Sequence, residues 1–258
     1  MGQPLPALLE RLERAVGPSG ERRDSYTATG PQAQRVADRL PLVHRTAGEG
    51  QDWREIFEHD TLTAMPVPTE HERKAGRANT VYFFLGAGAY PSGQIALLLE
   101  LETLRDVKAS FSPYDTGGMR YCTPSCGWDD DRRCQHLTEY TGDAPDDVHG
   151  FAGPYLAAHF RDPRGYVQAL QRSTPDFPSF HELISDGDRR AWTIEIQAHD
   201  DVGISSEAQF LRQLLVVGTH KLLELPDEYL ARARVLPDNA TENIIYTEIA
   251  RTIEAGLT

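Results

Sequence analysis

One short strand of the sequence is expected to end on three residues that can do chemistry. The apolar run 40–43 is followed directly by His44, Arg45 and Thr46, which predicts a titratable ring, a fixed cation and a hydroxyl at a strand end. An arginine there presents paired donors to a phosphate or a carboxylate, and a histidine is a weaker donor. The plainer interpretation is a surface ion pair for Arg45 and a hydrogen-bonded strand-end ring for His44.

The second candidate is a cluster that holds all three cysteines of the chain. The stretch CTPSCGWDDDRRCQH spaces them as C-x3-C-x7-C-x-H, with Cys122, Cys126, Cys134 and His136 as the candidate ligands. Three thiolates and an imidazole complete a tetrahedral zinc site of the structural kind, and such a metal would order a long polar loop. Because the spacing differs from the common C-x2-C pattern, free thiols in a loop and an iron–sulfur site stay as alternatives.

Two pairs of polar residues alternate along predicted strands, which places each pair on one strand face. Ser110 and Ser112 alternate in ASFS, and Glu195 and Gln197 alternate in WTIEIQ. The face that carries Glu195 is either solvated or functional. A second Glu-x-Gln triplet begins at Glu207, which also fits an ordinary helix start capped by a preceding serine.

The order of these motifs resembles that of the ADP-ribosyltransferase superfamily. The set is VHRT, then VYFFLGAGAYPSG and ASFSPYDTGG, then WTIEIQ and ISSEAQFL, within residues 40–225. In that family a first strand supplies Arg or His for NAD, a middle strand supplies an aromatic residue or a Ser-x-Ser edge, and a late strand supplies a glutamate. The family commonly has Gln/Glu-x-Glu in the last motif, whereas both triplets here have the reverse order.

The resemblance implies an enzyme that cleaves the nicotinamide–ribose bond of NAD and modifies an acceptor. The implied NAD-binding residues are His44, Arg45, Thr46, Tyr82, Tyr90 and Ser110, and the implied catalytic residues are Glu207, Glu195 as second choice, and Ser112. The bond breaks through a cationic state, which a carboxylate stabilises as the charge develops. A tyrosine would stack on the nicotinamide ring, although Tyr82 also fits a core position.

A non-catalytic function is the alternative. A binding or regulatory protein of related fold, with a zinc-held loop, would keep the strands without the reaction, as the reversed Glu-x-Gln order permits. Its acidic surface would then face a basic protein partner.

Composition limits the partners. The chain of 258 residues has 26 basic and 39 acidic side chains and a formal net charge of −13, and a field of that sign repels nucleic-acid phosphates. No apolar run has the length of a membrane span, and the first residues lack the order of a secretory signal. These features predict a cytoplasmic protein with small-molecule or protein partners, and they leave the oligomeric state open.

The elements that must position these residues predict an α+β fold, with mixed or antiparallel central sheets, flanking helices and a long polar insertion. Strands are expected at 80–86, 93–102, 107–112 and 190–197, and helices at 5–16, 31–40, 151–160 and the C-terminus. Residues 112–150 lack hydrophobic periodicity, which predicts the insertion. We expect an N-terminal helix and linker over 1–30 and a single α+β domain over 31–258.

Overall fold

A computed structural model of the chain describes much of the predicted sheet and several helices. The described residues are 3–4, 7, 30–46, 52–67, 73, 78–86, 95–112, 142–144, 148–159, 166, 193–204, 211–218, 222, 224–237 and 251. The helices are α2 (Gly30–Ala37), α3 (Trp53–His59), η1 (Leu101–Leu104, a 3-10 turn), α6 (Val148–His159) and α8 (Asp227–Leu230). The strands are β1 (Gln3–Pro4), β2 (Leu42–Arg45), β3 (Thr61–Leu62), β4 (Met65–Pro66), β5 (Asn79–Leu85), β6 (Ile95–Leu99), β7 (Ala109–Ser112), β8 (Gly142–Ala144), β9 (Glu195–Ala198), β10 (Val202–Gly203), β11 (Leu211–Val217) and β12 (Ala233–Leu236).

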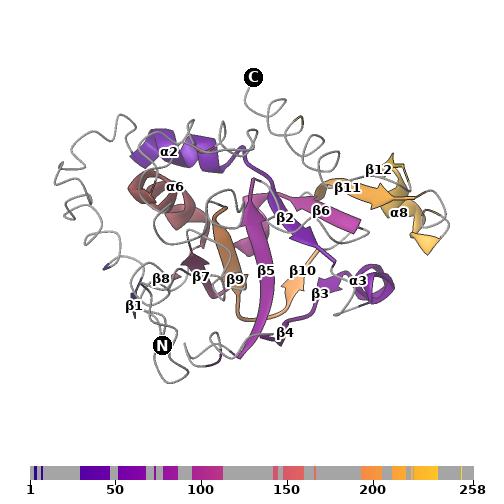
Figure 1. The fold of residues 1–258 in the computed structure, drawn as a ribbon, viewed down its shortest axis with the longest axis horizontal. Coiled ribbons are helices and arrows are strands. Elements are labelled where there is room, and N and C mark those ends of the chain that lie inside the picture. The colour runs from indigo at the N-terminus through magenta and orange to yellow at the C-terminus, as the bar shows by residue number, and fades with distance from the viewer. Residues whose placement is uncertain are drawn as a thin grey trace, which may run out of the picture.

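Ten of these strands form one mixed sheet, which confirms the α+β prediction. The order is β1-β8-β7-β9-β5-β2-β6-β11-β12, with β4 paired to β5, and Figure 1 shows this order across the molecule. The pairs β1–β8 and β11–β12 are parallel, and the other pairs of the sheet are antiparallel. As expected from its consecutive leucines, β6 is buried at every position.

One face of the sheet is apolar and packs against α6. Phe111 on β7 and Tyr155 on α6 are both fully buried, with their ring centroids 5.0 Å apart. Tyr166, in the same core, also contacts the sheet. Its hydroxyl donates to Leu85 O at 2.5 Å and accepts from Ile194 N at 3.1 Å. Burial raises the pKa of Tyr166, so the phenol stays neutral and keeps both hydrogen bonds.

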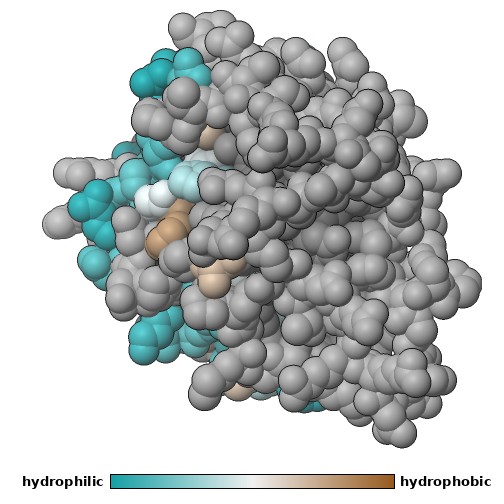
Figure 2. Space-filling view, turned by 90° about the vertical axis from the view of Figure 1, so that its left-hand side faces the viewer, coloured by the Kyte–Doolittle hydropathy of each residue, from teal (hydrophilic) through white to brown (hydrophobic). Residues whose placement is uncertain are grey.

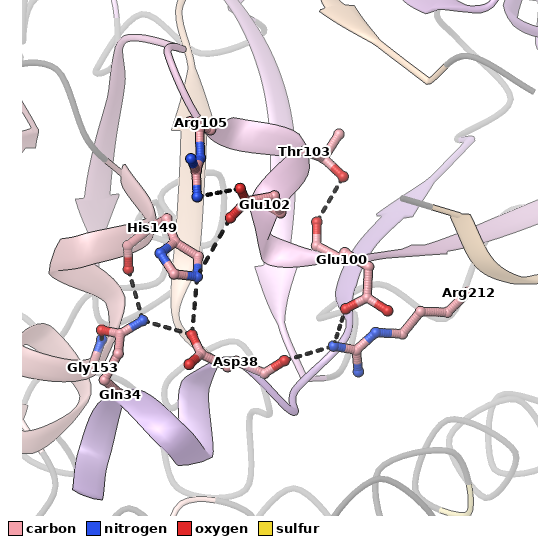
Figure 3. A network of polar contacts seen from close by, with 9 residues as sticks. All are labelled: Gln34, Asp38, Glu100, Glu102, Thr103, Arg105, His149, Gly153 and Arg212. Atoms are coloured by element: carbon pink, nitrogen blue, oxygen red, sulfur yellow. Dashed lines mark hydrogen bonds and ion pairs between the residues drawn. The ribbon is translucent and has the colours of Figure 1, made fainter. Parts of the chain in front are cut away.

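Helices α2 and α6 lie side by side (Figure 1) and are joined to η1 by polar contacts (Figure 3). His149 Nε2 on α6 lies 3.1 Å from Asp38 Oδ1, just after α2, and 3.6 Å from Glu102 Oε2 on η1. Gln34 on α2 donates to the carbonyl of His149 at 2.9 Å. Arg212 on β11 donates to the carbonyl of Asp38 at 2.7 Å. These polar contacts therefore connect the helix pair to η1 and to strand β11 of the sheet.

The structure shortens the expected insertion and contains several strands that were not expected. Within 112–150, β8 and the first turn of α6 are regular. The three residues of β8 carry no periodic signal, and pairing with β7 defines them as a strand. The strand β11 was not expected, because the sequence just before it, at Glu207, also fits a helix start. The strand β12 was not expected either. The helices expected at 5–16 and at the C-terminus lie almost entirely outside the described residues.

The surface seen from the side of β7 and β8 is hydrophilic over most of its described area, with small hydrophobic areas among the polar ones (Figure 2). None of the helices in the described ranges has the length and apolar character needed to cross a membrane.

Candidate functional site

A strip of polar side chains occupies one face of the central strands, opposite the apolar face. Ser112 pairs with Glu195 and Ser110 pairs with Gln197 across β7 and β9, and Tyr82 on β5 pairs with Gln197 from the other side. Cross-strand partners lie on the same face of a sheet. Ser110, Ser112 and Glu195 are 0% exposed and Gln197 is 1% exposed. The face that carries Glu195 is therefore covered by protein.

Arg45 belongs to this polar face, whereas His44 does not. Val43 pairs with Phe84, and period-two alternation then places Arg45 on the face of Phe84 and Tyr82. Arg45 is buried at 8% exposure. The ring of His44 lies on the apolar face, with its centroid 5.6 Å from that of Phe83. Strand alternation thus separates the two residues that follow each other in the sequence.

The surroundings of His44 determine the tautomer and the charge of its imidazole ring. Its Nδ1 lies 2.9 Å from the carbonyl oxygen of Tyr82, so Nδ1 carries a proton and donates. Desolvation by burial lowers the pKa of His44, and this hydrogen bond opposes the shift in part. Near neutral pH His44 is therefore a neutral imidazole with its proton on Nδ1.

The carboxylate of Glu195 is held by its neighbour on the same strand. Gln197 Nε2 donates to Glu195 Oε1 at 2.6 Å. Opposite Glu195, the hydroxyl of Ser112 is buried and has no hydrogen-bond partner among the described residues. A buried hydroxyl costs free energy unless a partner is supplied. Ser112 and Glu195 together therefore offer a hydroxyl and a carboxylate to a polar ligand group.

Two other hydroxyl groups of the expected site, those of Ser110 and Thr46, form hydrogen bonds within the protein. Ser110 Oγ donates to Asp143 Oδ1 on β8 at 2.6 Å and lies 2.7 Å from His199 Nε2. Thr46 Oγ1 donates to Ile95 O at 3.3 Å, at the end of the β2–β6 pair. These bonds hold the Ser110 and Thr46 side chains within the sheet, and the contact with NAD that the family resemblance implies for them stays a prediction.

Several predicted site residues lie outside the described part of the chain. They are Tyr90, Glu207 and the four candidate zinc ligands, Cys122, Cys126, Cys134 and His136. Among the residues that the structure does describe, no three His, Cys, Asp or Glu side chains are grouped so that they could hold a metal ion. The zinc prediction therefore stays a prediction.

Two residues of the polar face, His199 and Asp143, were not predicted from the sequence. His199 follows Gln197 by two positions, so the alternation Glu195, Gln197, His199 was a signal that could have found it. Asp143 gave no signal, because it lies at the end of the polar stretch read as an insertion. Its place beside Ser110 results from the register between β7 and β8.

No family model matches the chain, and no curated protein matches it.

Proposed function

We propose that the protein is an NAD-using enzyme of the ADP-ribosyltransferase kind, with Glu195 as the catalytic carboxylate. The observation that carries the proposal is the facing pair of Ser112 and Glu195 on adjacent strands, on the same buried face as Arg45 and Tyr82. The sequence resemblance implies these residue types, and in the sheet they lie on one face.

The chemistry needs a carboxylate where positive charge develops. In the proposed reaction the bond between nicotinamide and C1′ of ribose breaks, and its electron pair leaves with nicotinamide. An acceptor nucleophile, or water, then bonds to C1′ and loses a proton. A carboxylate away from water stabilises the cationic sugar more strongly than a solvated one, because the local dielectric is low. Glu195 is fully buried, which suits it to this role.

Arg45 and Ser112 have separate tasks in the proposal. A guanidinium binds phosphate oxygens with two parallel hydrogen bonds, so Arg45 is assigned to the pyrophosphate of NAD. Ser112 is assigned to a ribose hydroxyl beside Glu195, because its own hydroxyl is buried with no partner in the described residues. His44 has no part in this set, since it lies on the other face.

Burial of the site has a kinetic consequence. Because Glu195 and Ser112 are 0% exposed, NAD can reach them only when the protein that covers this face moves. Association that requires a conformational change falls below the usual range of roughly 10⁵–10⁷ M⁻¹s⁻¹. Slow, saturable binding of NAD is therefore expected.

Nicotinamide release from NAD, with and without candidate protein acceptors, tests the proposal. Glu195→Gln keeps the size and a hydrogen-bond acceptor but removes the charge, and it is expected to lower kcat more than about a hundredfold. Glu207→Gln is the matched variant, because it makes the same change in the other Glu-x-Gln triplet. A full rate in Glu195→Gln together with a collapse in Glu207→Gln would move the catalytic role to Glu207.

A non-catalytic binding or regulatory function is the second candidate. The observation that favours it is the hydrogen bond from Gln197 to Glu195 on a covered face, which a purely structural polar cluster would also show. In that case neither nicotinamide release nor an NAD-dependent rise in melting temperature would be seen, and a basic protein partner would be the ligand.

The zinc site is a further part of the proposal. The polar stretch with Cys122, Cys126, Cys134 and His136 connects β7 to β8, and these two strands pair in register through Phe111 and Gly142. The ends of the stretch are thus held together beside Ser112. A structural zinc ion bound by the three cysteines and the histidine would order this connection.

A further inference from the structure

Thr80 on β5 has a buried hydroxyl that the reaction proposed above does not use. The residue is 2% exposed, and its Oγ1 has no hydrogen-bond partner among the described residues. The hydroxyl of Ser112 is in the same state. Burial of a hydroxyl without a partner costs free energy, so a ligand that supplies the partner would be favoured.

The two hydroxyls lie on the same face of the sheet. Strand alternation places Thr80 on the face of Tyr82 and Phe84. Phe84 pairs with Glu195, which in turn pairs with Ser112 on β7. With a rise of ~3.4 Å per residue along β5 and ~4.8 Å between neighbouring strands, the backbone positions of Thr80 and Ser112 are roughly 17 Å apart. A single ribose cannot contact both hydroxyls at that separation, whereas a molecule with two riboses joined by a pyrophosphate can.

Arg45 lies between these two hydroxyls along the direction of the strands. Continuation of the pair Val43–Phe84 places Arg45 opposite Tyr82, and Tyr82 is midway between Phe84 and Thr80 on β5. A guanidinium at that level can bind a pyrophosphate that runs between the two ends of the face. Along the strands, the side chains thus follow the order ribose, pyrophosphate, ribose.

The end of the face that carries Thr80 is the more open one. Met65 on β4 pairs with Thr80 and is 40% exposed, whereas Ser112 and Glu195 are 0% exposed. Cross-strand partners share a face, and the sulfur of a methionine makes favourable contacts with aromatic rings. An adenine base therefore fits beside Met65, and the bond to be broken lies at the covered end, with Glu195.

We infer that Thr80 binds the ribose of the adenosine half of NAD, so that the site recognises the whole dinucleotide; this inference rests on the proposed function. The Thr80 hydroxyl forms a hydrogen bond with that ribose, while Ser112 and Glu195 contact the nicotinamide ribose. Because Thr80 is remote from the bond that breaks, its contact is the same in the ground state and in the transition state. Its loss should therefore raise KM for NAD and leave kcat unchanged.

Binding of ADP-ribose to the full chain tests the inference, because this molecule has both riboses and the pyrophosphate but no nicotinamide to lose. Thr80→Val replaces the hydroxyl by a methyl group and is expected to raise Kd for ADP-ribose, and KM for NAD, about tenfold. Thr80→Ser keeps a hydroxyl and is the matched control, expected to stay within about twofold of the parent Kd. Nicotinamide mononucleotide lacks the adenosine half, so Thr80→Val should not weaken its binding. An unchanged Kd for ADP-ribose in Thr80→Val, or an equal loss for both ligands, would overturn the inference.

The stability of the free protein gives a second readout. Since the Thr80 hydroxyl is buried without a partner among the described residues, Thr80→Val is expected to raise the melting temperature. Thr46→Val is the matched change at a hydroxyl that donates to Ile95 O, and it is expected to lower the melting temperature. An equal fall in both variants would show that the Thr80 hydroxyl is already satisfied within the protein, which would overturn the inference.

These measurements separate the inference from the proposed function. A protein that binds ADP-ribose through Thr80 but releases no nicotinamide from NAD would support the inference and contradict the enzyme proposal. A protein that releases nicotinamide but does not bind ADP-ribose, or binds it equally well in Thr80→Val, would support the enzyme proposal and overturn the inference.

Discussion

Gln197 and Glu195 lie two residues apart on β9, and the amide of the first donates to the carboxylate of the second at 2.6 Å on a fully buried face. This bond offsets part of the cost of keeping a carboxylate away from water. Loss of the bond should therefore lower the stability of the protein.

Gln197→Leu is expected to lower the free energy of unfolding by about 1–3 kcal/mol, because a buried carboxylate loses a donor. Denaturant titration at neutral pH measures the change. Glu195→Leu/Gln197→Leu is the matched control, since removal of both polar partners from a buried site is much less costly than removal of one. A double variant that loses the full sum of the two single losses would show that the bond contributes little.

Gly153→Ala is expected to destabilise the protein by about 1–3 kcal/mol through overpacking. A Cβ atom at this position would lie 2.4 Å from the Cα of Gln34 and 2.5 Å from its backbone nitrogen, so α2 and α6 would have to move apart. Thermal unfolding measures the effect. Gly203→Ala is the control, because its Cβ would have nothing within 4 Å; equal losses in both variants would contradict the packing argument.

Protonation of His44 gives a pH dependence with a definite sign. Burial lowers its pKa below the ordinary value of 6.5, so below pH 6.5 the unfolded chain binds a proton that the folded chain does not. The free energy of unfolding should therefore fall as the pH drops from 6.5 toward the folded-state pKa. His44→Asn keeps a donor for the Tyr82 carbonyl but does not titrate, and its stability should fall less over the same pH range. Parallel curves for the two proteins would rule out this role of His44.

The proposed zinc site predicts about one equivalent of zinc per chain by elemental analysis, held by Cys122, Cys126, Cys134 and His136. Removal of the metal by a chelator, or Cys134→Ser, should raise hydrogen exchange in the connection between β7 and β8 while β5 and β6 stay protected. Because this connection starts next to Ser112, nicotinamide release should fall with the zinc content. His59→Ala, which changes a histidine of α3, should retain the metal. Purified protein with no zinc after growth in zinc-containing medium would end this prediction.

The sequence was sufficient for the central strands and for the composition of the polar strip. β5, β6 and β7 were expected from their apolar content and alternation, and Glu195 and Gln197 were expected on one face. Alternation defines two faces of a strand but does not say which one is covered, so the burial of Glu195 required the structure. His44 and Arg45 were taken as one set because they are adjacent in sequence, although the same alternation places them on opposite faces. β8 could not be identified, because its three residues carry no periodic signal and pairing with β7 defines them as a strand. β11 was not expected, because the sequence just before it, at Glu207, also fits a helix start.

The position of β9 between β5 and β7 also leaves one edge of each of these two strands without its partner until late in synthesis. β5 and β7 emerge from the ribosome well before residues 195–198, and at roughly 5–20 residues per second the interval lasts several seconds. During that interval the facing edges of β5 and β7 are both open, and open strand edges can pair with other chains. Synthesis of β9, the strand that carries Glu195, supplies the partner of both edges. Chains truncated before residue 195 are therefore expected to be insoluble.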